Sequence, residues 1–497
     1  AHAKGMKIVQ DVVLQHTGNF GEKTFCELFT KKFNDVTELA DLEKTMIPSD
    51  YLLSTYGLSS PEEYWAQRPQ VQYDQRLNLM KDTTITTNND TGSPLNDAKT
   101  MAKVSTNGTY NAKNYYHNGY WQSLNWDDWT CKYAQIAGDC VDLNTENPEV
   151  AEKLVEFYGN YIGMGVDAFR VDTTRHISRL SLNTMFNKQL NAIGGNSFYM
   201  FGEVCCRFSQ TWYRGHASES VPFYTWDEPD TSYSSKWQWE STSDNAFLNG
   251  NDYHTPDYSK ASGLGTIDFL MHWQFDSAGG AFTGALGEDQ YFNDSTWNVV
   301  YVDSHDYAPD RNQASRFTGG TLTWAENMCL MFTFRGIPCL YYGSEVEFQK
   351  GVVIDVGPNA PLSETGRAYF GDYLEGSVTA SDFGDYTASG KVSETLNSTL
   401  SQQLIKLNKI RKAVPALQKG QYSVNDVTGS IAFKRGYTDP NTGDKSFACV
   451  SVTDAATFKN IPNGTYIDAV TGDTKTVTDG TLSIAASGKG NCRVYVL

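Results

Sequence analysis

The most informative part of the sequence is residues 165–176, which read Gly165-Val166-Asp167-Ala168-Phe169-Arg170-Val171-Asp172-Thr173-Thr174-Arg175-His176. Its apolar residues predict a short buried strand that ends in an aspartate. Because alternate residues of a strand lie on the same face, Arg170 and Asp172 should point the same way. A neighbouring guanidinium favours the ionised form of a carboxylate, which is the form that a carboxylate nucleophile needs. A structural ion pair on a strand has the same pattern, so this stretch alone does not establish a catalytic site.

Three other segments have the same form, an apolar strand followed by polar or charged residues. They are residues 5–16, which end in Gln15 and His16, residues 198–204, which contain Glu203, and residues 299–306, which end in His305 and Asp306. Stretches with helical periodicity lie between them. Functional groups presented by the C-terminal ends of several strands are typical of a β/α barrel.

The four segments resemble, in this order, the conserved regions of the α-amylase family of glycoside hydrolases. Val141-Asp142-Leu143-Asn144 is similar to a further short motif of that family, and residues 336–345 (Gly336-Ile337-Pro338-Cys339-Leu340-Tyr341-Tyr342-Gly343-Ser344-Glu345) are similar to its eighth-strand signature. The resemblance runs from the first residue to about Pro415. It implies an α/β fold, a TIM (β/α)8-type barrel with an inserted domain and a C-terminal all-β sandwich.

The chain is accordingly expected to have three parts. Residues 1–16 and 139–415 would form the catalytic β/α barrel, domain A. Residues 17–138 would form the inserted domain B, since so long an excursion is rarely a structureless loop. Residues 416–497 contain short alternating stretches between turn signals, which predicts the C-terminal β-sandwich, domain C. Within the barrel we expect a helix over 149–163, the sixth strand over 266–270 and the last helix over 403–412.

Only about six of the eight strand–helix units of such a barrel are recognisable. Family members place two units before the strand at 7–14, and here six residues precede it. Six strands would leave exposed edges and an uncovered core. We therefore expect the first two units, the N-terminal barrel segment, to come from another segment or from a different N-terminus.

The resemblance assigns a role to each of three carboxylates. Asp172 would be the nucleophile, Glu203 the general acid and base, and Asp306 the acid that holds substrate hydroxyls and stabilises the transition state. Arg170 would keep Asp172 ionised, and Asp11 would brace Arg170. Retaining glycosidases place their two catalytic carboxyl groups roughly 5–5.5 Å apart, and the same spacing is expected here for Asp172 and Glu203. Nearby negative charge and restricted solvent should keep Glu203 partly protonated.

Four more residues match substrate-binding positions of the family. His16 and His305 would donate hydrogen bonds to hydroxyls of the sugar at the cleavage point, although a histidine at a strand end is often only a packing or capping residue. Arg175 and His176 would line the acceptor side. Arg175 stands where many amylases have lysine, which keeps the charge but changes the donor geometry.

A structural calcium ion at the junction of domains A and B is common in the family. Asp142 and the main-chain carbonyl of His176 match two of its ligands. Gln15 stands where an asparagine is usual, and its longer side chain displaces the ligand oxygen, so the site could be weakened or lost. No organic cofactor is expected.

Composition limits the partners and the location. Hydrophobic residues make up 40% of the 497 residues, and the formal net charge is −18. So acidic a chain is a poor partner for nucleic acid, and no apolar stretch reaches the length of a membrane span. The nine cysteines are an odd number. Disulfides Cys131–Cys140 and Cys449–Cys492 are compatible with the sequence, as are free buried thiols.

These observations favour a retaining hydrolase that cleaves internal α-1,4-glucosidic bonds of starch, maltodextrin or related α-glucans by double displacement. One alternative is an α-glucan transglycosylase, a glucanotransferase or maltosyltransferase, with the same three carboxylates. Another is a non-catalytic carbohydrate-binding relative, although such proteins typically lose one of the three acids. A starch polymer cannot enter a cell, so an extracellular or cell-surface location follows if starch is the substrate.

Overall fold

The structure is a computed structural model of the chain. It describes residues 1–16, 29–31, 46–55, 57–64, 66, 131–132, 136, 140, 142–207, 212–213, 216–217, 220–227, 255–310, 314–355, 360–382 and 385–497. The predicted domain B, residues 17–138, lies almost entirely outside these ranges and stays a prediction. The chain divides into two compact units, residues 1–250 with 257–266 and residues 251–256 with 267–497, and each is described by itself.

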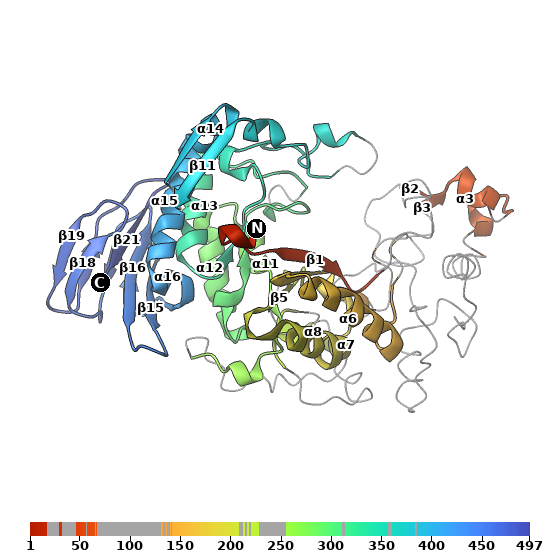
Figure 1. The fold of residues 1–497 in the computed structure, drawn as a ribbon, viewed down its shortest axis with the longest axis horizontal. Coiled ribbons are helices and arrows are strands. Elements are labelled where there is room, and N and C mark those ends of the chain that lie inside the picture. The colour runs from red at the N-terminus through yellow and green to blue at the C-terminus, as the bar shows by residue number, and fades with distance from the viewer. Residues whose placement is uncertain are drawn as a thin grey trace. The chain divides into compact units, whose positions relative to one another are not determined.

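The first unit contains a four-stranded parallel sheet, two strands of which, β1 and β5, are labelled in Figure 1. In spatial order its strands are β1 (Val9–Val13), β4 (Ala168–Asp172), β5 (Tyr199–Gly202) and β8 (Gly265–Thr266). The register of β1 with β4 places Asp11 opposite Arg170 and Val13 opposite Asp172. Because the strands are parallel, their carboxyl ends meet at one edge, as the sequence predicts.

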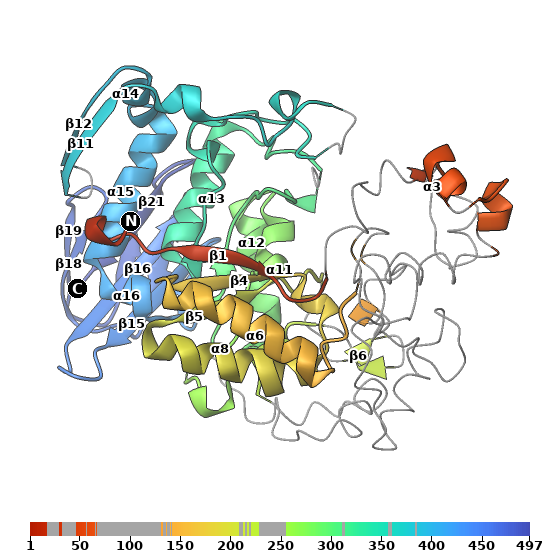
Figure 2. The same cartoon turned by 45° about the vertical axis from the view of Figure 1, so that its right-hand side comes forward.

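Helix α6 (Pro148–Gly163) follows the predicted boundaries closely. The Asn147 side chain accepts a hydrogen bond from the Glu149 amide, and Pro148 occupies the first helical position, where its missing N–H costs nothing. Helices α6 and α8 (Asn187–Gly194) lie side by side (Figure 2). The other elements of this unit are η1 (His2–Lys4), β2 (Phe29–Lys31), β3 (Met46–Pro48), α3 (Asp50–Thr55), η3 (Thr174–His176), α7 (Arg179–Ser181), the π-helical η4 (Leu182–Phe186), α8 (Asn187–Gly194), η5 (Gly195–Ser197), β6 (Trp212–Tyr213), β7 (His216–Ala217), α9 (Pro222–Thr225) and η7 (Tyr258–Lys260).

The predicted sixth strand, residues 266–270, is too long. Strand β8 ends at Thr266, and helix α11 (Phe269–Gln274) begins three residues later. The Asp268 side chain caps this helix by accepting a hydrogen bond from the Met271 amide at 3.1 Å. The apolar run therefore continues as a buried helix, which periodicity cannot distinguish from a buried strand over so few residues.

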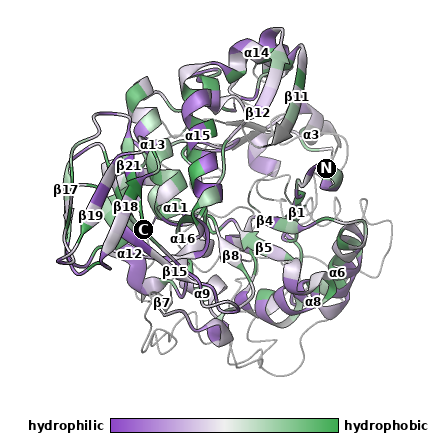
Figure 3. Cartoon of the chain, turned by 60° about the vertical axis from the view of Figure 1, so that its left-hand side comes forward, coloured by the Kyte–Doolittle hydropathy of each residue, from purple (hydrophilic) through white to green (hydrophobic). Residues whose placement is uncertain are grey.

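In the second unit, β9 (Val299–Val300) and β10 (Ile337–Pro338) pair in parallel. The predicted last barrel helix is present as α15 (Thr399–Ala413), and it begins earlier than expected because Ser398 caps it. Polar and apolar residues alternate around α15 (Figure 3). The other elements before the C-terminal sheets are α12 (Ala278–Glu288), η8 (Asp289–Tyr291), η9 (Ser295–Trp297), α13 (Thr321–Thr333), η11 (Ser344–Val346), η13 (Leu362–Glu364), η14 (Gly371–Leu374), β11 (Ser377–Asp382), β12 (Asp385–Ser389), α14 (Lys391–Leu396) and α16 (Pro415–Lys419).

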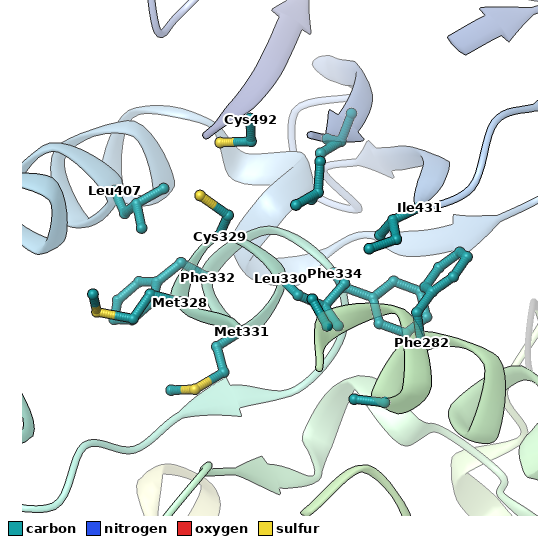
Figure 4. Close-up of a cluster of buried hydrophobic side chains, with 14 of the residues drawn as sticks. Phe282, Met328, Cys329, Leu330, Met331, Phe332, Phe334, Leu407, Ile431 and Cys492 are labelled. Atoms are coloured by element: carbon teal, nitrogen blue, oxygen red, sulfur yellow. The ribbon is translucent and has the colours of Figure 1, made fainter. Parts of the chain in front are cut away.

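The C-terminal part is all-β, as predicted. Two antiparallel sheets enclose a core to which Tyr466 and Tyr495 of the larger sheet and Phe458 of the smaller contribute. The opposite face of the larger sheet packs against α13 and α15 (Figure 4). In spatial order the larger sheet has β13 (Gln421–Ser423), β15 (Ala432–Thr438), β16 (Lys445–Val452), β21 (Cys492–Val496), β18 (Gly464–Asp468) and β19 (Thr474–Val477), and the smaller has β14 (Val427–Thr428), β17 (Ala456–Phe458) and β20 (Leu482–Ile484).

Among the described cysteines, neither predicted disulfide is present. In the ladder between β16 and β21, Cys449 is opposite Tyr495, and Cys492 is opposite Val452. The two cysteines are thus offset by an odd number of positions, which puts their side chains on opposite faces of the sheet. Cys449 lies between the two sheets, and Cys492 lies on the helix-covered face.

None of the described helices has both the length and the apolar character of a membrane span.

Candidate active site

One guanidinium, that of Arg170, joins three carboxylates in the first unit. Its Nη1 atom forms ion pairs with Asp172 and, at 3.0 Å, with Asp11, and its Nη2 atom lies 3.2 Å from Oε2 of Glu203. The side chains of Asp172 and Glu203 are 21% and 8% exposed. The predictions that Arg170 faces Asp172 and that Asp11 braces Arg170 are confirmed.

Parallel pairing of β4 with β5 brings Glu203 to this cluster. The Glu203 amide donates to the Val171 carbonyl at 2.9 Å, which continues the ladder one residue past β5. Thr173 follows Asp172 in the left-handed conformation, with φ of 51°, which is strained for a β-branched residue. In that conformation the Thr173 amide donates to Oε2 of Glu203 at 3.0 Å. The turn after β4 therefore holds the Glu203 carboxylate in place.

The pKa of Arg170 shows how the charges of the cluster act on one another. Burial disfavours its charge, yet the carboxylates of Glu203, Asp11 and Asp172 outweigh burial and raise the pKa of Arg170 overall. The guanidinium is thus fixed as a cation among three acids. For Glu203, the contacts with Arg170 and with the Thr173 amide favour the ionised form, and burial favours the neutral form.

His16 lies at the end of β1, where its main chain bridges that of Asp142. Its Nδ1 atom is 2.7 Å from Oε1 of Gln15, and the Gln15 amide donates to Oδ1 of Asp142 at 2.5 Å. Gln15 and Asp142 are both buried. Asp142, from the short motif before the β4 strand, therefore meets the end of the first strand, as the resemblance implies, and the sugar-binding role of His16 stays a prediction.

Arg175 and His176 are both buried in the turn η3 that follows Thr173. The Arg175 guanidinium donates to the Cys205 carbonyl, and Nδ1 of His176 is 3.0 Å from the Cys131 carbonyl. Burial lowers the pKa of His176 to about 4. These contacts give both side chains a packing function within the described residues, and their predicted place on the acceptor side stays a prediction.

The predicted calcium site is not tested by this arrangement. The residues that the structure describes contain no cluster of three His, Cys, Asp or Glu side chains suited to a metal. At Asp142 the Gln15 side chain presents an N–H group, where a cation would need an oxygen. We therefore derive no chemistry through calcium.

The third carboxylate, Asp306, belongs to the second unit. Its Oδ1 atom accepts from Nη2 of Arg367 at 2.9 Å, and its Oδ2 atom is 2.9 Å from Nε2 of His305. The Arg367 Nε–H group also donates to the His305 carbonyl at 2.9 Å. Ser304 closes the turn by accepting from the Asp306 amide at 3.1 Å. The side chain of Asp306 remains 30% exposed.

Asp303, the other aspartate of this segment, has a structural role. It is buried, and it accepts hydrogen bonds from the Ser344 hydroxyl at 2.9 Å and the Phe317 amide at 3.2 Å. Burial raises the pKa of Asp303. Of the two acids, Asp306 is the more exposed.

The sequence reasoning missed Arg367. It holds Asp306 with one guanidinium nitrogen and Asp355 with the other, at 2.9 and 3.0 Å. Arg367 lies in an irregular segment, in no strand or periodic pattern, so the sequence offers no local signal for its role.

Comparison with known proteins identifies the family. The family profile described as "Alpha amylase, catalytic domain" matches residues 1–358. The α-amylase of Streptomyces lividans is 25% identical over 89% of this chain and 42% of its own length, and the cyclomaltodextrin glucanotransferase of Klebsiella oxytoca is 24% identical over 76% and 53%. The chain thus spans about half the length of these relatives.

A solved structure supports the fold. The γ-cyclodextrin glucanotransferase (gamma-CGTase) of the alkalophilic Bacillus clarkii superposes with a TM-score of 0.50 at 16% identity, covering 100% of this chain and 54% of the other. With the family match, this similarity establishes a TIM barrel followed by a C-terminal all-β domain. On the evidence of the profile match over most of its length, the chain belongs to the alpha-amylase family of glycoside hydrolases.

Proposed function

We propose that this protein hydrolyses internal α-1,4-glucosidic bonds of starch, maltodextrin or related α-glucans with retention of configuration. The observation that carries the proposal is the sharing of one guanidinium, that of Arg170, between Asp172 and Glu203. Retaining glycosidases need two carboxyl groups held close together, one ionised to act as the nucleophile and one protonated to act as the acid. A common cationic anchor on neighbouring parallel strands is a direct way to hold them.

The proposed reaction has two steps. In the first, Asp172 attacks the anomeric carbon while Glu203 gives its proton to the leaving glycosidic oxygen, so that a glycosyl ester forms on Asp172. In the second, Glu203 takes a proton from water, and the water oxygen displaces Asp172. Asp306, oriented by Arg367, would hold substrate hydroxyls and stabilise the positive charge that develops on the sugar.

The cluster provides a reason why Glu203 can change roles. While Asp172 is ionised, its charge and the burial of Glu203 favour a proton on Glu203. Once Asp172 is an ester, that negative charge is gone, and the Arg170 guanidinium and the Thr173 amide favour the Glu203 carboxylate. The general acid of the first step is thereby converted into the base of the second.

A pocket of the second unit that is partly lined by Arg367, the partner of Asp306, would suit a glucan. This pocket of about 620 Å³ is lined by Arg367 and by apolar and aromatic residues, among them Tyr369 and Leu362. The Tyr369 side chain is highly exposed. Exposed rings suit the apolar faces of sugars, and a neutral glucan is indifferent to the acidic charge of the chain. If starch is the substrate, an extracellular or cell-surface location follows, since a polymer of this size cannot enter a cell.

A glucanotransferase is the second candidate, because one of the relatives reported above is a cyclomaltodextrin glucanotransferase. It would use the same glycosyl ester on Asp172 but pass the sugar to another sugar hydroxyl instead of water.

The test is incubation with soluble starch, with new reducing ends and the chain-length distribution measured together. Asp172→Asn, Glu203→Gln and Asp306→Asn are compared with Asp479→Asn, which changes an exposed aspartate in the turn between β19 and β20. Hydrolysis predicts a rise in reducing ends that the first three variants abolish and the fourth retains. Redistributed chain lengths without new reducing ends would indicate the transferase. No change in either, with starch still bound, would indicate a non-catalytic carbohydrate-binding relative and contradict the proposal.

A further inference from the structure

The partner that the structure gives to Cys492 is Cys329, which lies far from it in sequence. Cys329 is on helix α13, and Cys492 begins strand β21 of the C-terminal sheet. The two thiols are neighbours in one buried cluster, and Figure 4 shows the two cysteine side chains next to each other. Both side chains are buried, at 1% and 3% exposure.

The surrounding contacts hold the two thiols in place. The Gln403 side-chain amide of α15 lies 3.2 Å from Sγ of Cys329 and donates to the Gly490 carbonyl at 2.7 Å. Gly490, with φ of 82°, lies directly against α13, where an added Cβ would come within 3.3 Å of Ala325. The loop before Cys492 is therefore clamped to the helix that carries Cys329.

A solvent-connected cavity reaches the pair. Both cysteines line a pocket of about 870 Å³. Other residues of its lining are exposed, among them Gln402, Lys406 and Asn491. A small disulfide reagent can therefore approach thiols that are otherwise buried.

We propose that Cys329 and Cys492 form a reversible disulfide that links barrel helix α13 to the last strand of the C-terminal domain. The oxidant is a small-molecule disulfide such as oxidised glutathione. One cysteine thiolate attacks it, forms a mixed disulfide and releases one glutathione. The other thiolate then attacks the protein sulfur of the mixed disulfide and releases the second glutathione. Two protein thiols are oxidised, and one glutathione disulfide is reduced to two thiols.

The rate of this exchange should rise with pH. The neighbouring Cys492 thiol and burial raise the pKa of Cys329 well above its ordinary value. Only the thiolate attacks, so oxidation should be slow at pH 7 and faster at pH 9. This inference is independent of the proposed activity, and its readouts do not include turnover.

The test is to incubate the protein with oxidised glutathione at pH 9, block the remaining thiols and map the peptides without reduction. We expect a peptide that joins Cys329 to Cys492, and its loss after dithiothreitol. The oxidised protein should unfold at a temperature roughly 5 °C higher than the reduced protein, since the bond closes a long loop. Each variant is compared with its own reduced form, so lower stability in a variant does not obscure the result.

Cys329→Ala and Cys492→Ala should abolish both the cross-linked peptide and the shift in unfolding temperature. Cys449→Ala is the matched control, because Cys449 is buried on the other face of the same sheet, and it should keep both. Three outcomes would overturn the proposal: both thiols remaining reduced, Cys492 bonded to another cysteine, or a reaction that stops at a glutathione adduct.

Discussion

Nη2 of Arg170 lies 3.2 Å from Oε2 of Glu203, across two neighbouring parallel strands. Because Arg170 also pairs with Asp172 and Asp11, its guanidinium fixes the spacing of both proposed catalytic acids. A lysine has a single ammonium group and cannot reproduce this fork.

Arg170→Lys should therefore reduce kcat on a maltooligosaccharide by on the order of 100-fold or more, because the acids lose their fixed geometry. The acid limb of the pH–rate profile should also move, because the charge that favours the ionised carboxylates is displaced. Kinetics from pH 4 to 9 test both effects. Arg493→Lys is the control, since Arg493 pairs with Asp468 in the C-terminal sheet. A normal kcat in Arg170→Lys would contradict the shared-anchor role.

Arg367→Ala should lower kcat roughly 10- to 100-fold, because Asp306 loses its guanidinium partner. We expect Arg367→Lys to restore part of this loss. Asp355→Ala, which removes the other partner of Arg367, should have a smaller effect. Steady-state kinetics with separate kcat and KM values distinguish the two roles. If Asp355→Ala and Arg367→Ala were equally impaired, the ion pair with Asp306 would not be the important one.

Arg170 and Arg367 differ in whether their contacts could be predicted from the sequence. Arg170 and Asp172 are alternate residues of one apolar strand, so local periodicity fixes their common face. Arg367 reaches Asp306 from an irregular segment, and only tertiary structure brings the two together. The error at 266–270 has a similar origin, since a helix cap at Asp268 decides between strand and helix where the apolar pattern does not.

The disulfide prediction for Cys449 and Cys492 failed for a similar reason, because the sequence does not predict the register of paired strands. Cys449 and Cys492 do lie on paired strands, β16 and β21, but their offset in register is odd. Neither composition nor strand prediction determines this register, because it depends on the turns and on packing on both faces of the sheet. Cys329, the cysteine that we propose as the partner of Cys492, lies on a helix instead.

Gly202→Ala should lower activity by more than its loss of folding stability would cause. A Cβ at this position would come within 2.5 Å of the Thr174 hydroxyl, and Gly202 directly precedes Glu203. Relieving the clash requires movement of the turn that positions Glu203, at a cost of about 1–3 kcal/mol in unfolding free energy. Activity and chemical denaturation should be measured together.

Gly287→Ala is the matched control, because Gly287 lies in helix α12 with open space around its Cα. There the substitution should stabilise the protein by about 0.5–1 kcal/mol and leave activity unchanged. Wild-type activity in Gly202→Ala would show that the β5 terminus is not sterically coupled to the turn after Asp172.

His176 should make the protein sensitive to acid. Burial lowers its pKa in the folded state to about 4, from 6.5 for an unburied histidine. Between these values the unfolded chain binds a proton that the folded protein does not, so the free energy of unfolding falls as pH drops from 6.5 to 4. The full loss would be about 3 kcal/mol. Denaturation of the wild type at pH 7, 6, 5 and 4.5 measures this slope. His176→Gln should flatten it, at the cost of lower stability at pH 7, and His2→Gln, which changes an exposed histidine, should retain it. An unchanged slope in His176→Gln would assign the acid sensitivity to other groups.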